Sequence, residues 1–268
     1  MSPESAKDLD LLRDCAKAAG RLALELREKG LEIWSKPGGS PVTNADMAVD
    51  AMVKQGLRGA RPDYGWLSEE TADDPARLAA RRLFIVDPID GTRSFMKGGP
   101  WWVVALAVVE DGQPTAAVIY APVQDETYEA TVGGGARLNG EPIRASATTE
   151  LDRCAMLGDA ALFNRRIWAT PWPSMQLTSR NAIAYRMALV ASGAYDAAVA
   201  LGPKADWDIC AGTLICREAG ALATDHKGGA LVFNTPHAKN PSLICAAPGV
   251  HPLILDRTRP IDLPDERP

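Results

Sequence analysis

Residues 83–95 read LFIVDPIDGTRSF, and this stretch predicts the centre of the fold. The apolar run at 83–86, followed within a few residues by Pro and Gly, is typical of a buried strand that ends abruptly. Asp87 and Asp90 come next, separated by Pro88, which has no backbone N–H to donate. Two carboxylates this close repel one another unless a cation lies between them. We therefore expect both acids to face one point at the end of the strand.

The next two residues, Gly91 and Thr92, predict a sharp turn into a short helix. Glycine allows the backbone to approach a ligand closely, and threonine is a good N-cap residue. Free N–H groups at such a helix start point at an anion. Hard cations such as Mg²⁺ take oxygen ligands and leave positions open for a substrate phosphate. The stretch therefore indicates a metal site beside a phosphate-binding turn, with a solvated structural turn as the alternative.

The composition indicates a soluble globular protein with an anionic surface. The chain has 268 residues, enough for one large domain or two closely packed halves. Apolar residues make up 46% of it and charged residues 24%, as is usual for soluble proteins. The net charge of −5, without a long basic run, argues against a nucleic-acid polymer as the main partner. An anionic small molecule would need a metal or local arginines to hold it.

The five cysteines are odd in number and include no C-x-x-C pair. A disulfide framework or a thiolate zinc site is therefore not expected, and a reducing cytoplasm fits best. The first residues show no basic stretch followed by an apolar core, so we expect no secretory signal. The longest apolar run, residues 101–109, is too short to span a bilayer, and we expect no membrane partner.

Residues 1–144 are predicted to form an α+β half. Apolar spacing indicates an amphipathic helix over 5–29 and a second helix with Asp46 in its first turn. The loop that contains Lys36 is expected to be flexible, with that lysine solvated; the alternative is that Lys36 is a mobile residue on the substrate side. Residues 71–82 are a candidate mobile flap. Strand patterns follow at residues 101–110, 115–120 and 127–131. This half therefore reads as an antiparallel sheet with helices on one side.

Residues 145–268 are predicted to form an α/β half that closes the active site. Strands are expected at residues 154–157, 175–177, 195–200 and 243–246, and helices at residues 182–192, 207–218 and 248–255. This alternation indicates a second layer of strands and helices. Asp206 and Asp208 open one of the helices, where acids commonly cap. The polar tail from Asp256 is expected to be loosely held, and the three histidines fit no metal-ligand spacing.

Several motifs in a fixed order connect the chain to a known family. The main ones are DPIDGT at residues 87–92 and, in the second half, Trp207-Asp208 with Ala211-Gly212 and Glu218-Ala219-Gly220. Supporting matches are Thr43-x-x-Asp46, Ser68-Glu69-Glu70, Tyr120-Ala121-Pro122 and Asn139-Gly140. From about Leu9 to Leu255 the chain resembles the inositol monophosphatase superfamily of metal-dependent, lithium-sensitive phosphatases. The resemblance implies an α+β or α/β fold, a five-layered αβαβα sandwich of the sugar-phosphatase type.

The resemblance also implies the metal ligands. Glu69, Asp87 and the Ile89 carbonyl would bind a first metal, and Asp90 and Asp208 would join Asp87 on a second. A third, more weakly bound metal would be held mainly by Glu69, so two or three Mg²⁺ ions are expected. Paired metals generate the attacking water and stabilise the leaving alkoxide. This chemistry needs no activated Ser, Cys or His.

The catalytic residues that the resemblance implies are Asp46, Glu69 and Thr92. Thr92, supported by Asp46, would orient and deprotonate the attacking water. The backbone amides of Gly91 and Thr92 would hold phosphate oxygens. If this site is intact, the chain hydrolyses a small-molecule phosphate ester; the alternative is a scaffold or sensor that kept the fold and lost turnover.

The substrate is indicated less directly. Inositol-specific members carry a glutamate shortly before Trp-Asp, whereas residues 200–202 here read ALG. Residues 202–208, GPKADWD, instead resemble the Gly-Pro-x-x-x-Trp-Asp of CysQ-like 3'(2'),5'-bisphosphate nucleotidases. A second phosphate would favour additional cations. Four basic side chains are candidates for that contact: Arg93, Arg180, Arg186 and Lys204.

The match to the nucleotidase branch is incomplete, because its Gly-Ser-Ser is replaced by residues 182–184, AIA. The Gly-Thr-Arg-Ser-Phe stretch also resembles histidinol-phosphate phosphatases, which usually lack the tryptophan of Trp-Asp. We therefore rank 3'-phosphoadenosine 5'-phosphate first, inositol-1-phosphate or another sugar phosphate second, and histidinol phosphate third. A homodimer is expected, with an apolar contact supplied by Trp101-Trp102 or by residues 163–172.

Overall fold

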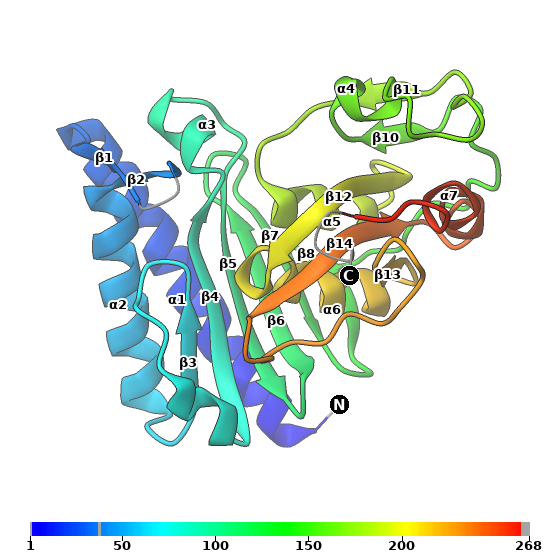
Figure 1. Cartoon of the computed structure of the whole chain (residues 1–268). Coiled ribbons are helices and arrows are strands. Elements are labelled where there is room, and N and C mark those ends of the chain that lie inside the picture. The colour runs from blue at the N-terminus through cyan, green and yellow to red at the C-terminus, as the bar shows by residue number, and fades with distance from the viewer. Residues whose placement is uncertain (1, 37–38, 264–268) are drawn as a thin grey trace.

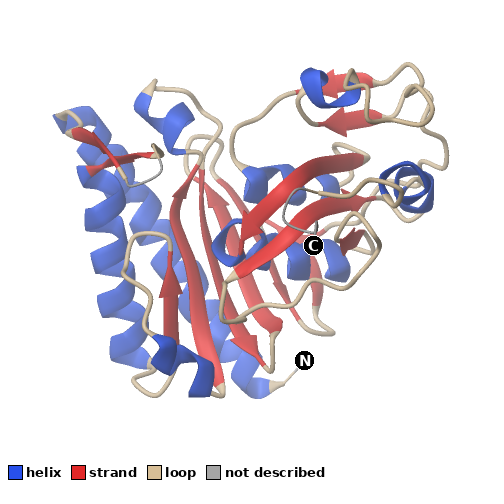
Figure 2. Cartoon of the chain, in the orientation of Figure 1, coloured by secondary structure: helices blue, strands red, loops and turns tan. Residues whose placement is uncertain are grey.

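The computed structural model describes residues 2–36 and 39–263, which form five layers (Figures 1 and 2). Helices α1 (Pro3–Lys29) and α2 (Asn44–Ala60) cover one face of a seven-stranded sheet. Helices α5 (Ile183–Ala191) and α6 (Asp206–Glu218) lie between that sheet and a five-stranded sheet. Helix α7 (His251–Thr258) packs on the outer face of the smaller sheet. The predicted αβαβα sandwich is confirmed.

The larger sheet has the strand order β3-β4-β5-β6-β7-β8-β9. Its strands are β3 (Gly65–Ser68), β4 (Arg82–Asp90), β5 (Val103–Glu110), β6 (Gln113–Ala121), β7 (Glu126–Thr131), β8 (Gly135–Leu138) and β9 (Glu141–Pro142). All neighbours are antiparallel except β3 and β4, so the predicted antiparallel sheet is wrong for this pair. A parallel pair needs a long return connection, which residues 69–81 provide with the 3₁₀ helix η1 (Pro75–Ala79).

The smaller sheet has the strand order β11-β10-β12-β14-β13. Its strands are β10 (Ala155–Leu157), β11 (Gln176–Thr178), β12 (Ala197–Ala205), β13 (Leu222–Thr224) and β14 (Lys239–Ala246). A short helix, α4 (Ala160–Phe163), and a two-stranded hairpin of β1 (Ile33–Ser35) and β2 (Pro41–Thr43) complete the fold with α3, described below. The predicted division at residue 144 falls between the two sheets and stays a prediction.

Strand β5 explains why both faces of the larger sheet are covered. Its sequence VVALAVVE has no polar residue before its end, and every residue but the last is buried. Val104, Leu106 and Val108 face the core under α1 and α2, whereas Ala105 and Ala107 face the core under α5 and α6. Strands that are buried on both faces read as continuous apolar runs.

Two expectations about the outer parts of the chain need correction. Trp102 is fully buried and packs its ring on Phe95, so of the two neighbouring tryptophans only the half-buried Trp101 is open to a dimer contact, and the dimer stays a prediction. The tail is held as far as Leu263, because α7 extends through Thr258 and the Leu263 side chain is buried. Residues 264–268 of the tail lie outside the described residues. Among the residues described, none of the helices is both long and apolar enough to cross a bilayer.

Helices α5 and α6 approach each other closely at Gly212. A Cβ atom placed there would lie 2.7 Å from the Met187 Cβ and 2.6 Å from its Sδ. The sulfur end could move, but the Met187 Cβ is fixed by its backbone. Glycine at this helical position therefore serves packing, although it has poor helix propensity.

We expect Gly212→Ala to destabilise the protein by about 1–3 kcal/mol, because overpacking outweighs the gain in helix propensity. Gly56→Ala in α2 is the matched control, since its Cβ would meet only the Cys15 Sγ at 3.9 Å. That control should be neutral or more stable by up to about 1 kcal/mol. Urea unfolding of both variants measures the difference. Equal stabilisation by the two alanines would contradict the close contact.

Candidate active site

Strand β4 carries both acids of the central motif into the core. It continues to Asp90, with Asp87 opposite Ala105 and Asp90 opposite Val103. The register shifts between the two acids, where Pro88 cannot donate a ladder hydrogen bond. The expectation that the strand ends at residue 86 is therefore wrong. Both carboxylates are buried, and they lie at the bulged end of a strand rather than in a solvated turn.

The turn after Asp90 starts the short helix α3 (Thr92–Met96). Gly91 is its N-cap residue and has a left-handed backbone with φ +96°, and a Cβ there would lie 2.7 Å from the Trp101 carbonyl oxygen. The expectation that Thr92 is the N-cap is wrong, because Thr92 is the first helical residue. Its hydroxyl lies 3.1 Å from the Ile89 carbonyl oxygen and 3.3 Å from the Asp46 carboxylate.

Asp46 reaches Thr92 from the first turn of α2. Its Oδ2 accepts hydrogen bonds from the Thr43 backbone N–H at 2.8 Å and from the Thr43 hydroxyl at 2.6 Å. The first of these and the Asp46 backbone N–H, which donates to the Thr43 hydroxyl oxygen at 3.3 Å, form a capping box. The Asp46 Oδ1 is left to face Thr92. Burial raises the pKa of Asp46, and the Thr43 hydrogen bonds partly oppose that rise. The predicted pair of Asp46 and Thr92 is thus brought together, while its role stays a prediction.

A pocket of about 300 Å³ opens above these residues. It contains the predicted metal ligands and phosphate-side residues Glu69, Asp87, Ile89, Asp90, Gly91, Thr92, Arg93, Arg186 and Asp208. Glu69 follows β3 and Asp208 lies in the first turn of α6, so the pocket joins the larger sheet to the middle helix layer. An adjoining pocket of about 270 Å³ shares Asp90, Arg186 and Asp208 and adds Lys204.

Some residues of the pocket were missed by the sequence analysis. Ser40, Pro41 and Asn181 line it, but they belong to no motif. Lys36 is not solvated as expected, because its Nζ lies 2.9 Å from Glu69 and 2.7 Å from Glu70. The paired glutamates of the sequence were the signal that could have located a lysine there.

Three of the four candidate basic side chains lie at the pockets, and Arg180 does not. Arg180 lines neither pocket, and its guanidinium lies 4.0 Å from the centre of the Trp101 ring. Arg186 donates to the Arg180 backbone carbonyl and keeps its guanidinium at the pocket wall. Arg93 is exposed at the pocket rim. The structure therefore places Arg93, Arg186 and Lys204 at the site.

The acids of the pocket strongly disfavour simultaneous ionisation. Burial raises the pKa of Asp87 well above its ordinary range, and Glu69 and Asp90 raise it further. Burial and Asp208 do the same for Asp90. The pKa of Asp208 is raised to about 6, mainly by burial and then by Glu69. Four acids that oppose each other's charge are an arrangement that a bound cation would relieve.

The donor set fits a hard divalent cation. Carboxylates and a backbone carbonyl at Ile89 supply only oxygen ligands, which suit Mg²⁺ and not the softer metals. In the part of the chain that the structure describes, no three acidic, His or Cys side chains yet converge closely enough to hold an ion. Glu69 is paired with Lys36 instead. Metal binding would therefore require Glu69 to exchange this lysine for the ion.

Comparison with known proteins gives a single family. The model of the inositol monophosphatase family matches residues 6–261. The chain is 34% identical over 234 residues to an inositol-1-monophosphatase of Mesorhizobium japonicum, covering 82% of this chain and 86% of the relative. It is 33% identical over 234 residues to a histidinol-phosphatase of Chlorobaculum parvum, with the same coverage of both chains. It is 30% identical over 232 residues to the Nus factor SuhB of Escherichia coli K12, again with that coverage.

Solved structures agree with the fold. The extragenic suppressor protein suhB of Bartonella henselae superposes with a TM-score of 0.81 at 27% identity, covering 93% of this chain and 97% of the other. An IMPase of Thermotoga maritima superposes with a TM-score of 0.81 at 28% identity, covering 93% and 96%. The fold is thus shared along nearly the whole chain.

The raised pKa of Asp208 predicts how stability depends on pH without metal. The folded state holds a proton up to about pH 6, whereas the unfolded state releases it near pH 4. The Asp208 contribution to the free energy of unfolding therefore falls as the pH rises from about 4 to above 6. We expect Asp208→Asn in EDTA to gain about 1–2 kcal/mol at pH 7.5 and nothing below about pH 4.

Urea unfolding of the wild type and Asp208→Asn across this pH range measures the effect. Mg²⁺ should stabilise the wild type at pH 7.5 and stabilise Asp208→Asn much less. An Asp208→Asn difference that does not change with pH would contradict the mutual repulsion of the acids.

Proposed function

The chain belongs to the inositol monophosphatase family and is a phosphoric monoester hydrolase, and we propose that it works with two or three Mg²⁺ ions on a small-molecule phosphate ester. Metal dependence is general in this family. The proposal rests on one observation: acids from three distant segments, at residues 69, 87–90 and 208, line one pocket, where burial and the neighbouring acids raise the pKa of Asp87, Asp90 and Asp208.

In this proposal Glu69, Asp87, the Ile89 carbonyl, Asp90 and Asp208 hold the ions. When bound, Mg²⁺ supplies charge neutralisation of the phosphate and an acidified water. The protein contributes position, because the buried acids are fixed by strand and helix backbones. Their fixed places determine where the phosphate can sit and allow attack from the side opposite the leaving alcohol.

Thr92 and Asp46 act on the water in this proposal. The Thr92 hydroxyl can accept a proton from the water only if it donates its own proton to another group. Asp46 Oδ1 lies 3.3 Å from the hydroxyl and is placed to accept that proton, because Asp46 Oδ2 already accepts hydrogen bonds from Thr43. The amides of Gly91 and Thr92 stand at the start of α3, where phosphate oxygens would be bound.

We propose 3'-phosphoadenosine 5'-phosphate as the preferred substrate. Arg186 and Lys204 border the two pockets, and neither has a salt-bridge partner within the described residues. The Arg186 side chain donates to the Arg180 backbone carbonyl, and the Lys204 side chain donates to the Pro203 backbone carbonyl. Unpaired cations beside a phosphate site favour a leaving group that carries a second anion.

Two other esters are alternatives, because relatives are named for them. Inositol-1-phosphate has a neutral polyol leaving group, which would offer Arg186 and Lys204 no second anion of the substrate. Histidinol phosphate carries an ammonium group, which these two cations would repel. The charges at the pocket therefore support the order of substrates given by the sequence.

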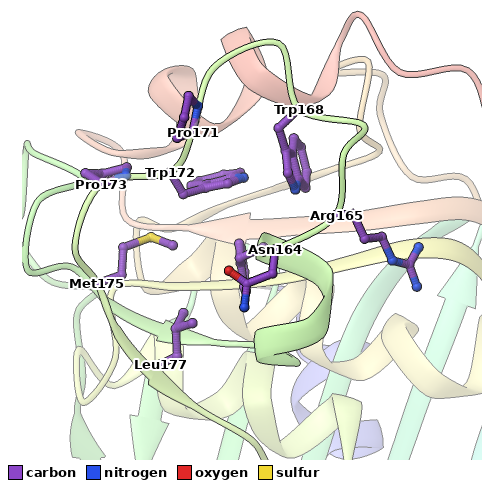
Figure 3. A pocket seen from close by; sticks show the side chains of 9 residues that line it. Asn164, Arg165, Trp168, Pro171, Trp172, Pro173, Met175 and Leu177 are labelled. Carbon is purple, nitrogen blue, oxygen red and sulfur yellow. The ribbon is translucent and has the colours of Figure 1, made fainter.

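We also propose that the protein is a lithium-sensitive, cytoplasmic homodimer. Support for the dimer comes from an aromatic pocket of about 340 Å³ in the connection between β10 and β11, lined by Phe163 and by Trp168 and Trp172. Figure 3 shows the two tryptophans in this pocket. Ile167 beside it is 46% exposed and Leu177 37%. Burying such side chains against a second copy would remove apolar area from water. A monomer at micromolar concentration in sedimentation velocity would contradict this contact.

Phosphate release with Mg²⁺ from the three esters, with and without lithium, measures substrate choice. We expect 3'-phosphoadenosine 5'-phosphate to give the highest kcat/KM, and Asp90→Asn to lose about 10²-fold or more on every ester. Arg186→Gln should raise the KM for the nucleotide about 10-fold or more while changing the KM for inositol-1-phosphate much less. Arg21→Gln, at an exposed position of α1, is the control and should change neither. Equal effects of Arg186→Gln on both esters would contradict its contact with a second anion.

A further inference from the structure

The connection between β3 and β4 is tied to the other half of the chain by Arg77. This arginine lies in η1, and it is only 3% exposed. Its Nη1 donates to the Asn234 side-chain oxygen at 2.6 Å, and its Nη2 donates to the Thr235 carbonyl at 3.1 Å. The Asn234 side-chain nitrogen returns a hydrogen bond to the Arg77 carbonyl at 3.3 Å. Residues about 157 positions apart in sequence are thus joined by reciprocal hydrogen bonds.

The charge of this buried guanidinium is compensated within its own segment. Asp73 accepts from the Arg77 Nε at 2.6 Å and from Nη2 at 3.0 Å. The planar guanidinium therefore serves three acceptors in different directions. A lysine ammonium has one nitrogen and cannot reach the carboxylate, the amide and the carbonyl together.

The link continues from Asn234 to the start of α6. The Asn234 backbone N–H donates to Asp206 Oδ2 at 2.8 Å, and the Asn240 side chain donates to Asp206 Oδ1 at 3.2 Å. Asp206 is fully buried and is the first residue of the helix. Asp208 lies two residues further, so the position of Asp206 sets where Asp208 enters the pocket.

The other end of the link leads to Glu69. Glu69 lies directly after β3, and its backbone N–H donates to the Val86 carbonyl of β4. Asp50 of α2 accepts hydrogen bonds from the Ser68 and Thr71 hydroxyls. The segment from Ser68 to Arg77 is thus anchored at its start on α2 and at its end on the residue 231–238 loop. The expected mobile flap at 71–82 stays a prediction, but η1 has fixed contacts at its centre.

We propose that Arg77 is a positioning residue for the metal site. The path Arg77–Asn234–Asp206 couples the connection that follows Glu69, next to the larger sheet, to the first turn of α6, which carries Asp208 in the middle helix layer. The acids of the pocket repel one another, so a tie between their two supports opposes their separation before an ion binds. Residues behind metal ligands commonly contribute 10- to 100-fold to metal affinity. The inference rests on the metal ligands of the proposed function.

Mg²⁺ binding measured by isothermal titration calorimetry tests the inference, with thermal unfolding in EDTA as the folding control. Arg77→Lys keeps the charge and removes the three-way contact. Asn234→Gly removes the contacting side chain and keeps the backbone favourable, because Asn234 has φ +60°. Arg81→Lys is the matched control in the same connection, since Arg81 is exposed and pairs with Glu110.

We expect Arg77→Lys and Asn234→Gly to weaken Mg²⁺ binding about 10-fold or more, with Arg81→Lys within about twofold of the wild type. Activity of the two variants should need correspondingly more Mg²⁺, while kcat at saturating Mg²⁺ stays within about threefold of the wild type. The double variant should lose little beyond either single variant, because both break one path.

Unchanged Mg²⁺ affinity in folded Arg77→Lys and Asn234→Gly, despite lower thermal stability, would overturn the inference and leave Arg77 a structural residue. The proposed function then still stands if Asp208→Asn abolishes binding that the wild type shows. A wild type that binds no Mg²⁺ would overturn both.

Discussion

Electrostatic repulsion between buried acids constrains this structure more than any other interaction. Asp87 and Asp90 are carried into the core by a strand that is buried along its whole length. Removing even one ionised carboxylate from water costs several kcal/mol unless it is paired. Lys36 pairs with Glu69 and Glu70, but Asp87 and Asp90 are left to hold protons or a cation. The buried carboxylates at the centre of the fold therefore need a proton or a cation to balance their charge.

The five-layered arrangement brings acids from separate helices and strands together at one pocket. Helix α2 places Asp46 behind Thr92, and strand β3 places Glu69 beside β4. Helix α6 packs between both sheets, so its first turn can deliver Asp208 from the other half of the chain. The close approach of α6 to α5 at Gly212 sets the distance between these two helices. The packing of the middle layer therefore also determines where Asp208 lies in the site.

The resemblance of the motifs to a known family was sufficient to predict the architecture and the acids of the pocket. Strand and helix periodicity alone would have left Asp46 and Asp208 as ordinary acids in the first turns of helices. The sequence could not reveal that β3 runs parallel to β4, since a return connection looks like any polar loop. It assigned Thr92 to the N-cap, where the left-handed Gly91 lies instead. The pairing of Lys36 with Glu69 was also missed. Such contacts join distant residues of ordinary type, and no local pattern marks them.

The account predicts that ions bind between the two halves of the chain, on the acids of one pocket. A crystal structure of the protein grown with Mn²⁺ in place of Mg²⁺ tests this directly, because anomalous scattering locates Mn²⁺ without assumptions about the ligands. The account predicts anomalous peaks beside Asp87, one shared with Glu69 and one shared with Asp90 and Asp208, with Lys36 displaced from Glu69. Well-occupied Mn²⁺ elsewhere, with Lys36 still on Glu69 and no peak at Asp87, would contradict it.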